Sequence, residues 1–225
     1  MNNIMDGVGA SLTLKKKIAN EIKQKNLKPC LAVIQVGDNK ASDIYVRNKN
    51  KACDMVGIKF INIKLPDTIS EDLIISEIER LNLDTNVNGI LVQLPLPPCF
   101  DEGRIINAIS PVKDVDGLTY PNVGNFVLEN ECLVSCTPMG VMELLDMYNV
   151  SLKGKNACIV GRSNLVGKPL IQLLLARDAT VSICHSKSLD IKSYTKMADV
   201  LIVAAGHPNL ITKDMVKEGA VVIDV

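Results

Sequence analysis

Short apolar runs alternate with amphipathic stretches along most of the chain. Residues 10–26 place leucine and isoleucine at roughly helical intervals, and the β-branched run 30–37 ends at Gly37. The same alternation predicts helices over 41–56 and 70–81 and strands over 58–65 and 88–97. Alternation of this kind is typical of a parallel sheet covered by helices.

The pattern changes after Pro98, where proline, glycine and asparagine cluster through residues 110–126 and predict a loop-rich segment. Helical periodicity returns over 137–149. The second half then predicts strands over 157–160, 180–184, 199–206 and 220–225 and helices over 167–178, 190–197 and 212–219. We therefore predict two α/β domains, residues 1–136 and 137–225, the second with a Rossmann-like parallel sheet.

Composition narrows the possible partners. The chain carries 25 basic and 25 acidic side chains, so no net field attracts nucleic acid or an anionic membrane. Aromatic residues make up 3%, too few for the stacking platforms that bind single-stranded nucleic acid. No apolar run approaches the roughly 18 residues that a membrane-spanning helix needs.

The seven cysteines are scattered, form no C-x-x-C pair and have only two histidines to help them bind a metal. We interpret them as reduced thiols and predict no metal site. The first ten residues lack the basic and then apolar order of a signal peptide. A cytoplasmic location fits these features best.

A candidate phosphate-binding turn lies in "NACIVGRSNLVGKPL". Gly161 follows a predicted strand directly, and Gly167 opens a helix with Pro169 in its first turn. Glycines there let the backbone approach a pyrophosphate, which the helix N-terminus attracts. Ser163 replaces the second glycine of G-x-G-x-x-G, so a plain α/β turn is the alternative.

The next predicted strand ends in "CHSKS" and offers no acid to bind a ribose 2′-hydroxyl. Arg162, His185, Ser186 and Lys187 instead favour a 2′-phosphate, because a guanidinium matches phosphate geometry. We therefore predict NADP as the cofactor. His185 taken alone is equally explained as a polar residue at a strand end.

Tyr45 and Lys49 are four residues apart in "SDIYVRNKNKAC" and project from one helical face. A phenol and an amine could thus serve one pocket, although a polar surface helix often contains such a pair by chance. Spacing alone does not decide between these interpretations.

Six motifs, in order, closely resemble the methylenetetrahydrofolate dehydrogenase/cyclohydrolase family, the bifunctional FolD enzymes. They are "SDIYVRNKNKACDMVGI", "GILVQLPLP", "KDVDGLTYPNVG", "TPMGVMELL", "GRSNLVGKP" and "CHSKS". The resemblance covers essentially the whole chain. It implies a catalytic domain, an NADP domain, a folate cleft between them, tetrahydrofolate one-carbon derivatives as substrates and a homodimer.

The resemblance also implies residue roles. Lys49 matches the essential lysine that handles protons and polarises the one-carbon unit, and Tyr45 matches the tyrosine lining the pterin site. Gln93 matches the glutamine hydrogen-bonded to that lysine, and Asp116 matches the aspartate holding the pterin ring. The implied cofactor residues are Gly161, Arg162, Ser163, Val166, Gly167, His185 and Ser186. Taken singly, Gln93 could be a strand-end cap, and Asp114 and Asp116 could brace a turn.

Two alternatives stay open: a two-domain dehydrogenase of another small metabolite, such as a shikimate-type enzyme, and a non-catalytic nucleotide-binding remnant. "VQLPLP" followed by "KDVDG" argues against the first. The second arises because "VVIDV" is the last segment, whereas the family continues with a cofactor-contacting segment and a final helix. A chain lacking that end is expected to bind NADP weakly. The sequence does not determine the relative rates or the physiological direction of the two activities.

Overall fold

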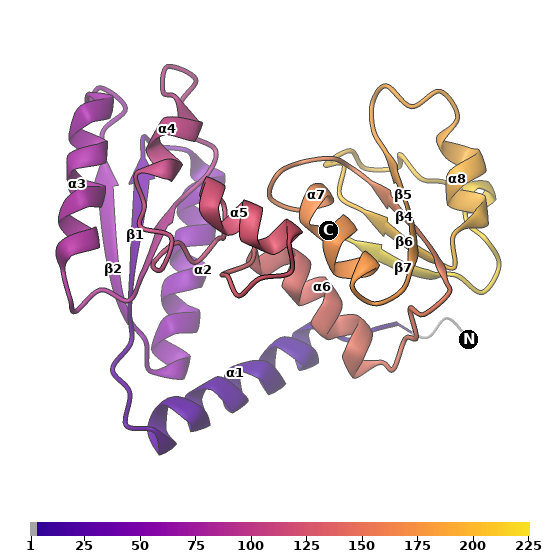
Figure 1. The fold of residues 1–225 in the computed structure, drawn as a ribbon, viewed down its shortest axis with the longest axis horizontal. Coiled ribbons are helices and arrows are strands. Elements are labelled where there is room, and N and C mark those ends of the chain that lie inside the picture. Colours follow the sequence, from indigo (N-terminus) through magenta and orange to yellow (C-terminus); the bar gives the residue numbers. More distant parts are fainter. Residues whose placement is uncertain (1–3) are drawn as a thin grey trace. The chain divides into compact units, whose positions relative to one another are not determined.

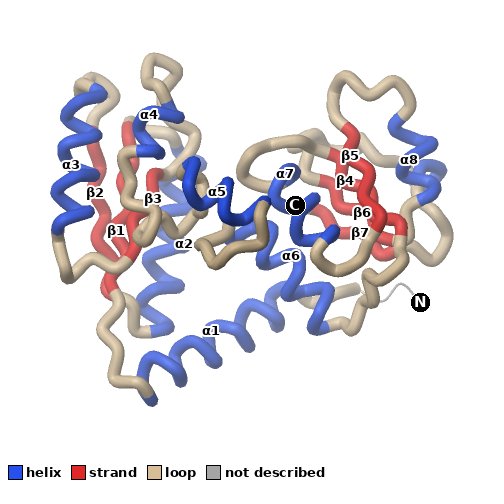
Figure 2. Tube along the Cα trace, viewed as in Figure 1, coloured by secondary structure: helices blue, strands red, loops and turns tan. Residues whose placement is uncertain are grey.

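The structure, a computed structural model, describes residues 4–225 and contains two compact α/β units (Figure 1). The first unit ends at Leu133, and the second runs Val134–Val225. Each unit has its own parallel sheet with helices on both faces, as Figure 2 shows. The predicted α/β class with two domains is confirmed. The predicted boundary, between residues 136 and 137, falls at the start of α6 (Cys136–Met147).

The first unit is built on a three-stranded parallel sheet in the order β2-β1-β3. Its strands are β1 (Cys30–Val36), β2 (Lys59–Leu65) and β3 (Gly89–Val92). Its helices are α1 (Gly7–Gln24), α2 (Lys40–Val56), α3 (Glu71–Leu83), α4 (Glu102–Asn107) and α5 (Tyr120–Val127). The predicted helix–strand alternation over residues 10–81 is therefore confirmed.

Alternation along β1 explains the layers of the first unit. Ile34 lies in a core cluster with Ile78 of α3 and Ile105 of α4, whereas Val33 lies in a separate cluster with Val46 of α2. All five side chains are at most 4% exposed. Burying each stabilises the fold by roughly 1.5–3 kcal/mol. Helices α3 and α4 therefore cover one face of the sheet, and α2 covers the other.

The second unit has a four-stranded parallel sheet in the order β5-β4-β6-β7. Its elements are α6, β4 (Asn156–Val160), α7 (Gly167–Leu175), β5 (Thr180–Cys184), α8 (Ile191–Met197), β6 (Val200–Val203), a 3₁₀ turn (Lys213–Met215) and β7 (Val221–Asp224). Cys158 and Val160 pack with the face that α8 covers, and Leu170 and Leu174 of α7 are fully buried. The chain crosses from β4 to its neighbours on both sides, as in a Rossmann-like sheet.

Three sequence predictions need correction. The strand predicted over 88–97 stops at Val92, since Pro95 and the prolines after it cannot donate ladder hydrogen bonds. Residues 110–126, predicted as loop-rich, include most of α5, and α4 before them was not predicted. Pro121 sits in the first turn of α5, where its missing N–H costs little. The helix predicted over 212–219 is only the 3₁₀ turn Lys213–Met215.

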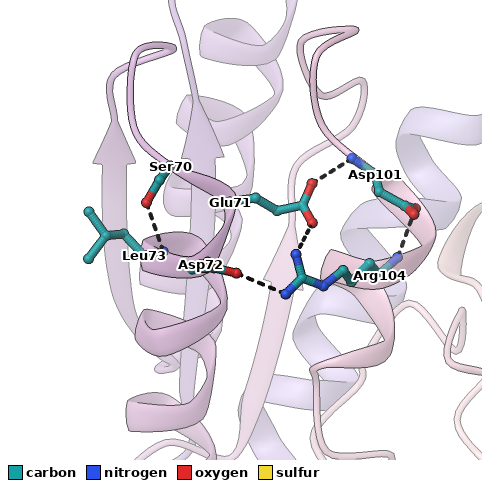
Figure 3. A network of polar contacts seen from close by, with 6 residues as sticks. All are labelled: Ser70, Glu71, Asp72, Leu73, Asp101 and Arg104. Atoms are coloured by element: carbon teal, nitrogen blue, oxygen red, sulfur yellow. Dashed lines mark hydrogen bonds and ion pairs between the residues drawn. The ribbon is translucent and has the colours of Figure 1, made fainter.

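A polar network joins the N-termini of α3 and α4 (Figure 3). The Arg104 guanidinium donates to Glu71 at 2.6 Å and to Asp72 at 2.8 Å. The other oxygen of Glu71 accepts from the Asp101 N–H at 2.8 Å, and Asp101 caps α4 by accepting from the Arg104 N–H. These bonds close the loop that follows β3 and so fix the path of the chain after Gln93.

No helix in the described part of the chain combines the length and apolar composition needed to cross a bilayer. The prediction that no signal peptide is present concerns the first ten residues, and residues 1–3 lie outside the described part.

Candidate functional site

A lysine and a glutamine from distant parts of the sequence meet in the first unit. Lys49 lies in α2, which Asn39 caps by accepting from two backbone N–H groups, and Val46 holds this helix against the sheet. Gln93 directly follows β3, and its N–H donates to the Ile34 carbonyl. The Lys49 Nζ donates to Gln93 Oε1 at 2.8 Å.

The Gln93 amide is fixed by a second hydrogen bond. Its Nε2 donates to the Leu94 carbonyl at 2.7 Å, so its oxygen faces Lys49. Gln93 is only 8% exposed, whereas Lys49 is half-buried. A neutral acceptor thus orients the amine, and part of the amine stays accessible to a ligand.

Asp116 lies near this pair. The chain just before it runs beside β3, where Ile90 donates to the Lys113 carbonyl and pairs with Asp114 in an isolated bridge. Burial raises the pKa of the Asp116 carboxyl, the positive charge of Lys49 lowers it, and the negative charge of Asp114 raises it again. Lys49, Gln93 and Asp116 therefore share one polar region at the carboxyl ends of the strands.

Tyr45 lies one turn before Lys49 on α2 and is 61% exposed. An exposed aromatic ring one turn from the lysine can stack against a planar ligand.

In the second unit, two glycines bring three backbone segments together after β4. Gly161 has φ +133°, and a Cβ there would lie 2.9 Å from the Ala204 carbonyl carbon and still nearer its oxygen. A Cβ on Gly167 would lie 2.7 Å from the Gly161 carbonyl carbon. Only glycine fits either position without backbone movement.

Ser163 shapes the turn between these glycines. Its Oγ accepts from the N–H groups of Val166 at 3.1 Å and Gly167 at 3.4 Å, at the start of α7. The serine that replaces the second glycine of the G-x-G-x-x-G pattern is thus a local cap. The N-terminus of this nine-residue helix still provides a positive electrostatic field that favours an anion.

Parallel pairing brings the candidate phosphate-binding side chains to one edge of this sheet. Val160 pairs with Cys184, and the Gly161 N–H donates to the Cys184 carbonyl at 2.8 Å. Arg162 and Ser186, which follow these strand ends, are both exposed. Among the described residues, nothing accepts a hydrogen bond from the Arg162 guanidinium, so its donors are available to a ligand.

His185 takes part in the turn after β5. Its N–H donates to Ser188 Oγ at 3.0 Å, and its Nδ1 accepts from the Lys187 N–H at 3.1 Å. The interpretation of His185 as a polar strand-end residue therefore accounts for these contacts. The remaining ring nitrogen, Nε2, can still face a ligand.

Sequence reasoning missed two contributors to the sites. Ala204 closes the Gly161 turn from the end of β6, and the only signal for it is the pair of small residues after the apolar run 200–203. Lys113 donates to the Leu81, Asn82 and Asp84 carbonyls at 2.7–3.0 Å and so caps α3. A lysine beside "DVDG" gives no sequence signal of that role.

The second unit fits a dinucleotide. The β4–α7 turn has the close glycine backbone that a pyrophosphate needs, the α7 N-terminus faces it, and no acid follows β5 at residues 185–188. A guanidinium and a serine stand there instead, which suits a 2′-phosphate.

Comparisons with known proteins agree with this geometry. Residues 5–116 match the model of the tetrahydrofolate dehydrogenase/cyclohydrolase catalytic domain, and residues 135–225 match that family's NAD(P)-binding domain. The bifunctional protein FolD of Agathobacter rectalis is 49% identical over 228 aligned residues, which cover 100% of this chain and 82% of the relative.

Solved structures support the same assignment. The bifunctional FolD enzyme of Campylobacter jejuni has a TM-score of 0.96 at 46% identity and is matched over 99% of this chain and 80% of its own. The Trypanosoma brucei FolD enzyme, solved with NADP and an inhibitor, has a TM-score of 0.93 at 34% identity, over 98% and 77%.

A more distant likeness bears on the shikimate-type alternative. The shikimate 5-dehydrogenase of Thermus thermophilus has a TM-score of 0.51 at 13% identity, covering 87% of this chain and 78% of its own, so it shares the fold alone.

Both family models and the similarity over the whole chain place this protein in the tetrahydrofolate dehydrogenase/cyclohydrolase family.

Proposed function

We propose that this protein oxidises 5,10-methylenetetrahydrofolate to 5,10-methenyltetrahydrofolate with NADP⁺ and then hydrolyses the product to 10-formyltetrahydrofolate. The observation that carries the proposal is the 2.8 Å hydrogen bond between Lys49 and Gln93, because it presents an oriented amine beside Asp116. Membership of the family supplies the substrate class.

In the first step, the chain's contribution is positioning. A pterin ring carries N–H donors on one edge, and the Asp116 carboxylate can accept from them when it is ionised. The exposed Tyr45 ring can pack against the folate one turn from Lys49. Bound NADP⁺ supplies the hydride acceptor, and holding the methylene carbon in a productive orientation accounts for much of the rate.

In the second step, water adds to the methenyl carbon of the cation, the bond from this carbon to N5 breaks as N5 takes up a proton, and one proton is released overall. Lys49 can accept that proton only as a neutral amine. Gln93 orients the amine without adding a negative charge that would hold the proton on it. The pair thus fits proton transfer better than a lysine–carboxylate ion pair would.

For the cofactor, we propose that Gly161, Ser163, Val166 and Gly167 form the pyrophosphate turn. Arg162 and Ser186 bind the 2′-phosphate, with His185 beside them. The available guanidinium donors and the absence of an acid in residues 185–188 support NADP over NAD.

We also propose the assembly and setting that the family resemblance implies. Residues 1–136 act as the catalytic domain and residues 137–225 as the cofactor domain of a homodimer. A cytoplasmic location is supported by the cysteines, none of which forms a disulfide within residues 4–225.

The test is Lys49→Met, which keeps the apolar stem and removes the amine. We expect cyclohydrolase turnover to fall about 10²–10⁴-fold, the range for a lost acid–base group. NADP affinity and thermal stability should stay unchanged, and the dehydrogenase step should fall less where its main requirement is positioning. The loss of methenyltetrahydrofolate absorbance measures the hydrolysis, and NADPH absorbance measures the oxidation.

Lys51→Met is the matched control, since Lys51 is exposed two residues further along the same helix. It should leave both activities at the parental level. Parental hydrolysis by Lys49→Met would show that Lys49 is not the proton-transfer group.

A further inference from the structure

The segment that carries Asp116 is held by the acid two residues before it. The Asp114 backbone carbonyl accepts from the Gly117 N–H at 3.1 Å. Its carboxylate oxygen Oδ2 accepts from the Thr119 N–H at 2.8 Å and from Asn122 Nδ2 at 3.0 Å. Asp114 therefore closes the turn around Asp116 with both its backbone and its side chain.

This carboxylate also anchors the N-terminus of α5, through the Thr119 N–H and the Asn122 side chain. Thr119 is the N-cap of α5, yet its side chain makes no capping bond, and its buried hydroxyl has no partner among the described residues. Asp114 is only 1% exposed, and the two donors to its carboxylate are neutral groups. Its charge is thus stabilised by these bonds and by the N-terminal end of α5.

The two acids act on each other through an apolar environment. A cavity of about 10 Å³, which has room for at most one water, is lined by both acids and otherwise by apolar residues. Those apolar residues are Ile90, Leu91, Val92, Ile106, Ile109 and Leu118. Little solvent separates the carboxylates, so the charge of Asp114 acts on Asp116, although burial and Lys49 affect the pKa of Asp116 more.

We propose that Asp114 is a positioning residue for the folate-binding carboxylate of Asp116: it fixes the turn that presents Asp116 and places a second buried carboxylate beside it. The proposal rests on the role of Asp116 in the proposed function. Asp114 itself does not contact the substrate.

The sign of the electrostatic effect follows from the charges around Asp116. Lys49 from α2 lowers the pKa of Asp116, and Asp114 from the same turn raises it. If the ionised Asp116 binds folate, kcat/KM for the folate substrate falls as pH drops through that pKa. Removing the Asp114 charge should therefore move this acidic limb to lower pH.

Asp114→Asn and Asp114→Ala separate charge from geometry. The asparagine oxygen can accept both hydrogen bonds, so Asp114→Asn keeps the turn and removes the charge. Asp114→Ala removes both bonds. We expect Asp114→Asn to retain the thermal midpoint and move the acidic limb of kcat/KM to lower pH. We expect Asp114→Ala to raise KM for the folate substrate about ten- to hundredfold at every pH, as a misplaced binding group does.

The experiment measures pH profiles of dehydrogenase kcat/KM on the full chain, with NADP dissociation constants and circular dichroism as controls. An Asp114→Asn profile that superimposes on the parental one overturns the proposal. So does a folded Asp114→Ala variant with parental KM. If Asp114→Ala does not fold, the Asp114→Asn profile decides alone.

Asp116→Asn, measured in parallel, tests the assignment on which the proposal rests. An unchanged folate KM in that variant would remove Asp116 from the folate site and with it this part of the proposed function. A raised KM in Asp116→Asn, combined with parental behaviour of both Asp114 variants, would overturn only the inference about Asp114.

Discussion

Gly161→Ala tests the backbone contact on which the cofactor site depends. In the native chain this residue has φ +133°, and an added Cβ would lie 2.9 Å from the Ala204 carbonyl carbon, where ordinary contacts lie at 3.4–4 Å. The new methyl group must therefore push the end of β6 away from the turn after β4.

Two costs can be assigned. A non-glycine residue held in a sparsely populated backbone conformation costs about 1–3 kcal/mol. Forcing a methyl group into a packed contact costs about 1–3 kcal/mol more. The sum, about 2–6 kcal/mol, is a large part of the 5–15 kcal/mol that stabilises a typical domain. We expect the second unit to unfold at clearly lower denaturant concentration and NADP affinity to fall with it.

Two further glycines provide matched controls. Gly154 has φ +70° with open space around it, so Gly154→Ala should cost only the backbone term, about 1–3 kcal/mol. Gly140 lies inside α6 with nothing within 4 Å, so Gly140→Ala should stabilise by about 0.5–1 kcal/mol. Denaturant titration followed by circular dichroism and calorimetric NADP titration measure the series. Parental stability and NADP affinity in Gly161→Ala would refute the close-approach argument.

Two other predictions concern charged side chains of the second unit. Arg162→Ala should weaken NADP by about 1.5–3 kcal/mol, the value of a charge-assisted hydrogen bond, and leave NAD nearly unaffected; equal losses in calorimetric titrations would mark Arg162 as structural. Arg177 lowers the pKa of Asp146 through bonds of 2.8 and 2.9 Å, but both side chains are nearly half exposed. Because the pKa of Asp146 is lower in the folded protein than in the unfolded chain, the ion pair stabilises the fold fully at pH values above the ordinary carboxyl pKa. This stabilisation is lost as the pH falls through the folded-state pKa of Asp146. Asp146→Asn should therefore cost about 0.5 kcal/mol at pH 7 and nothing in strong acid, as urea titrations at both pH values would show.

The sequence predicted those elements whose apolar residues face a core. The strands β1 and β4 are continuous apolar runs because almost every residue in them is buried, whereas the helices α2 and α3 show apolar positions at helical intervals. Helix α5 was missed because Pro121 and Gly124 look like loop residues, although proline suits a first turn. Tyr120, Val123 and Val127 have helical spacing but stay exposed, so no core contact marks them as one face.

The candidate site of the first unit could not be derived from spacing alone. Lys49 and Gln93 are 44 residues apart, and only the parallel register of β1 with β3 brings the end of β3 beside α2. The resemblance to the family, and not the spacing, predicted that these two side chains form a hydrogen bond. The cofactor turn was easier to predict, because Gly161 and Gly167 are local to one strand–turn–helix unit.

Lys49 forms its hydrogen bond with a neutral side chain, although two carboxylates lie in the same unit. Two carboxylates, Asp114 and Asp116, lie close to one another, yet the hydrogen bond from Lys49 goes to the neutral Gln93. A carboxylate partner would hold a proton on the amine and would be left buried and unpaired whenever the amine gave that proton up. With glutamine, the position of Lys49 is kept without a charged partner beside it. Asp116 in turn stays available to accept hydrogen bonds from a ligand, because its ionised form is neither bonded to Lys49 nor shielded by solvent. In the proposed mechanism, the proton-transfer group Lys49 and the binding group Asp116 are thus separate side chains, although the charge of Lys49 acts on Asp116.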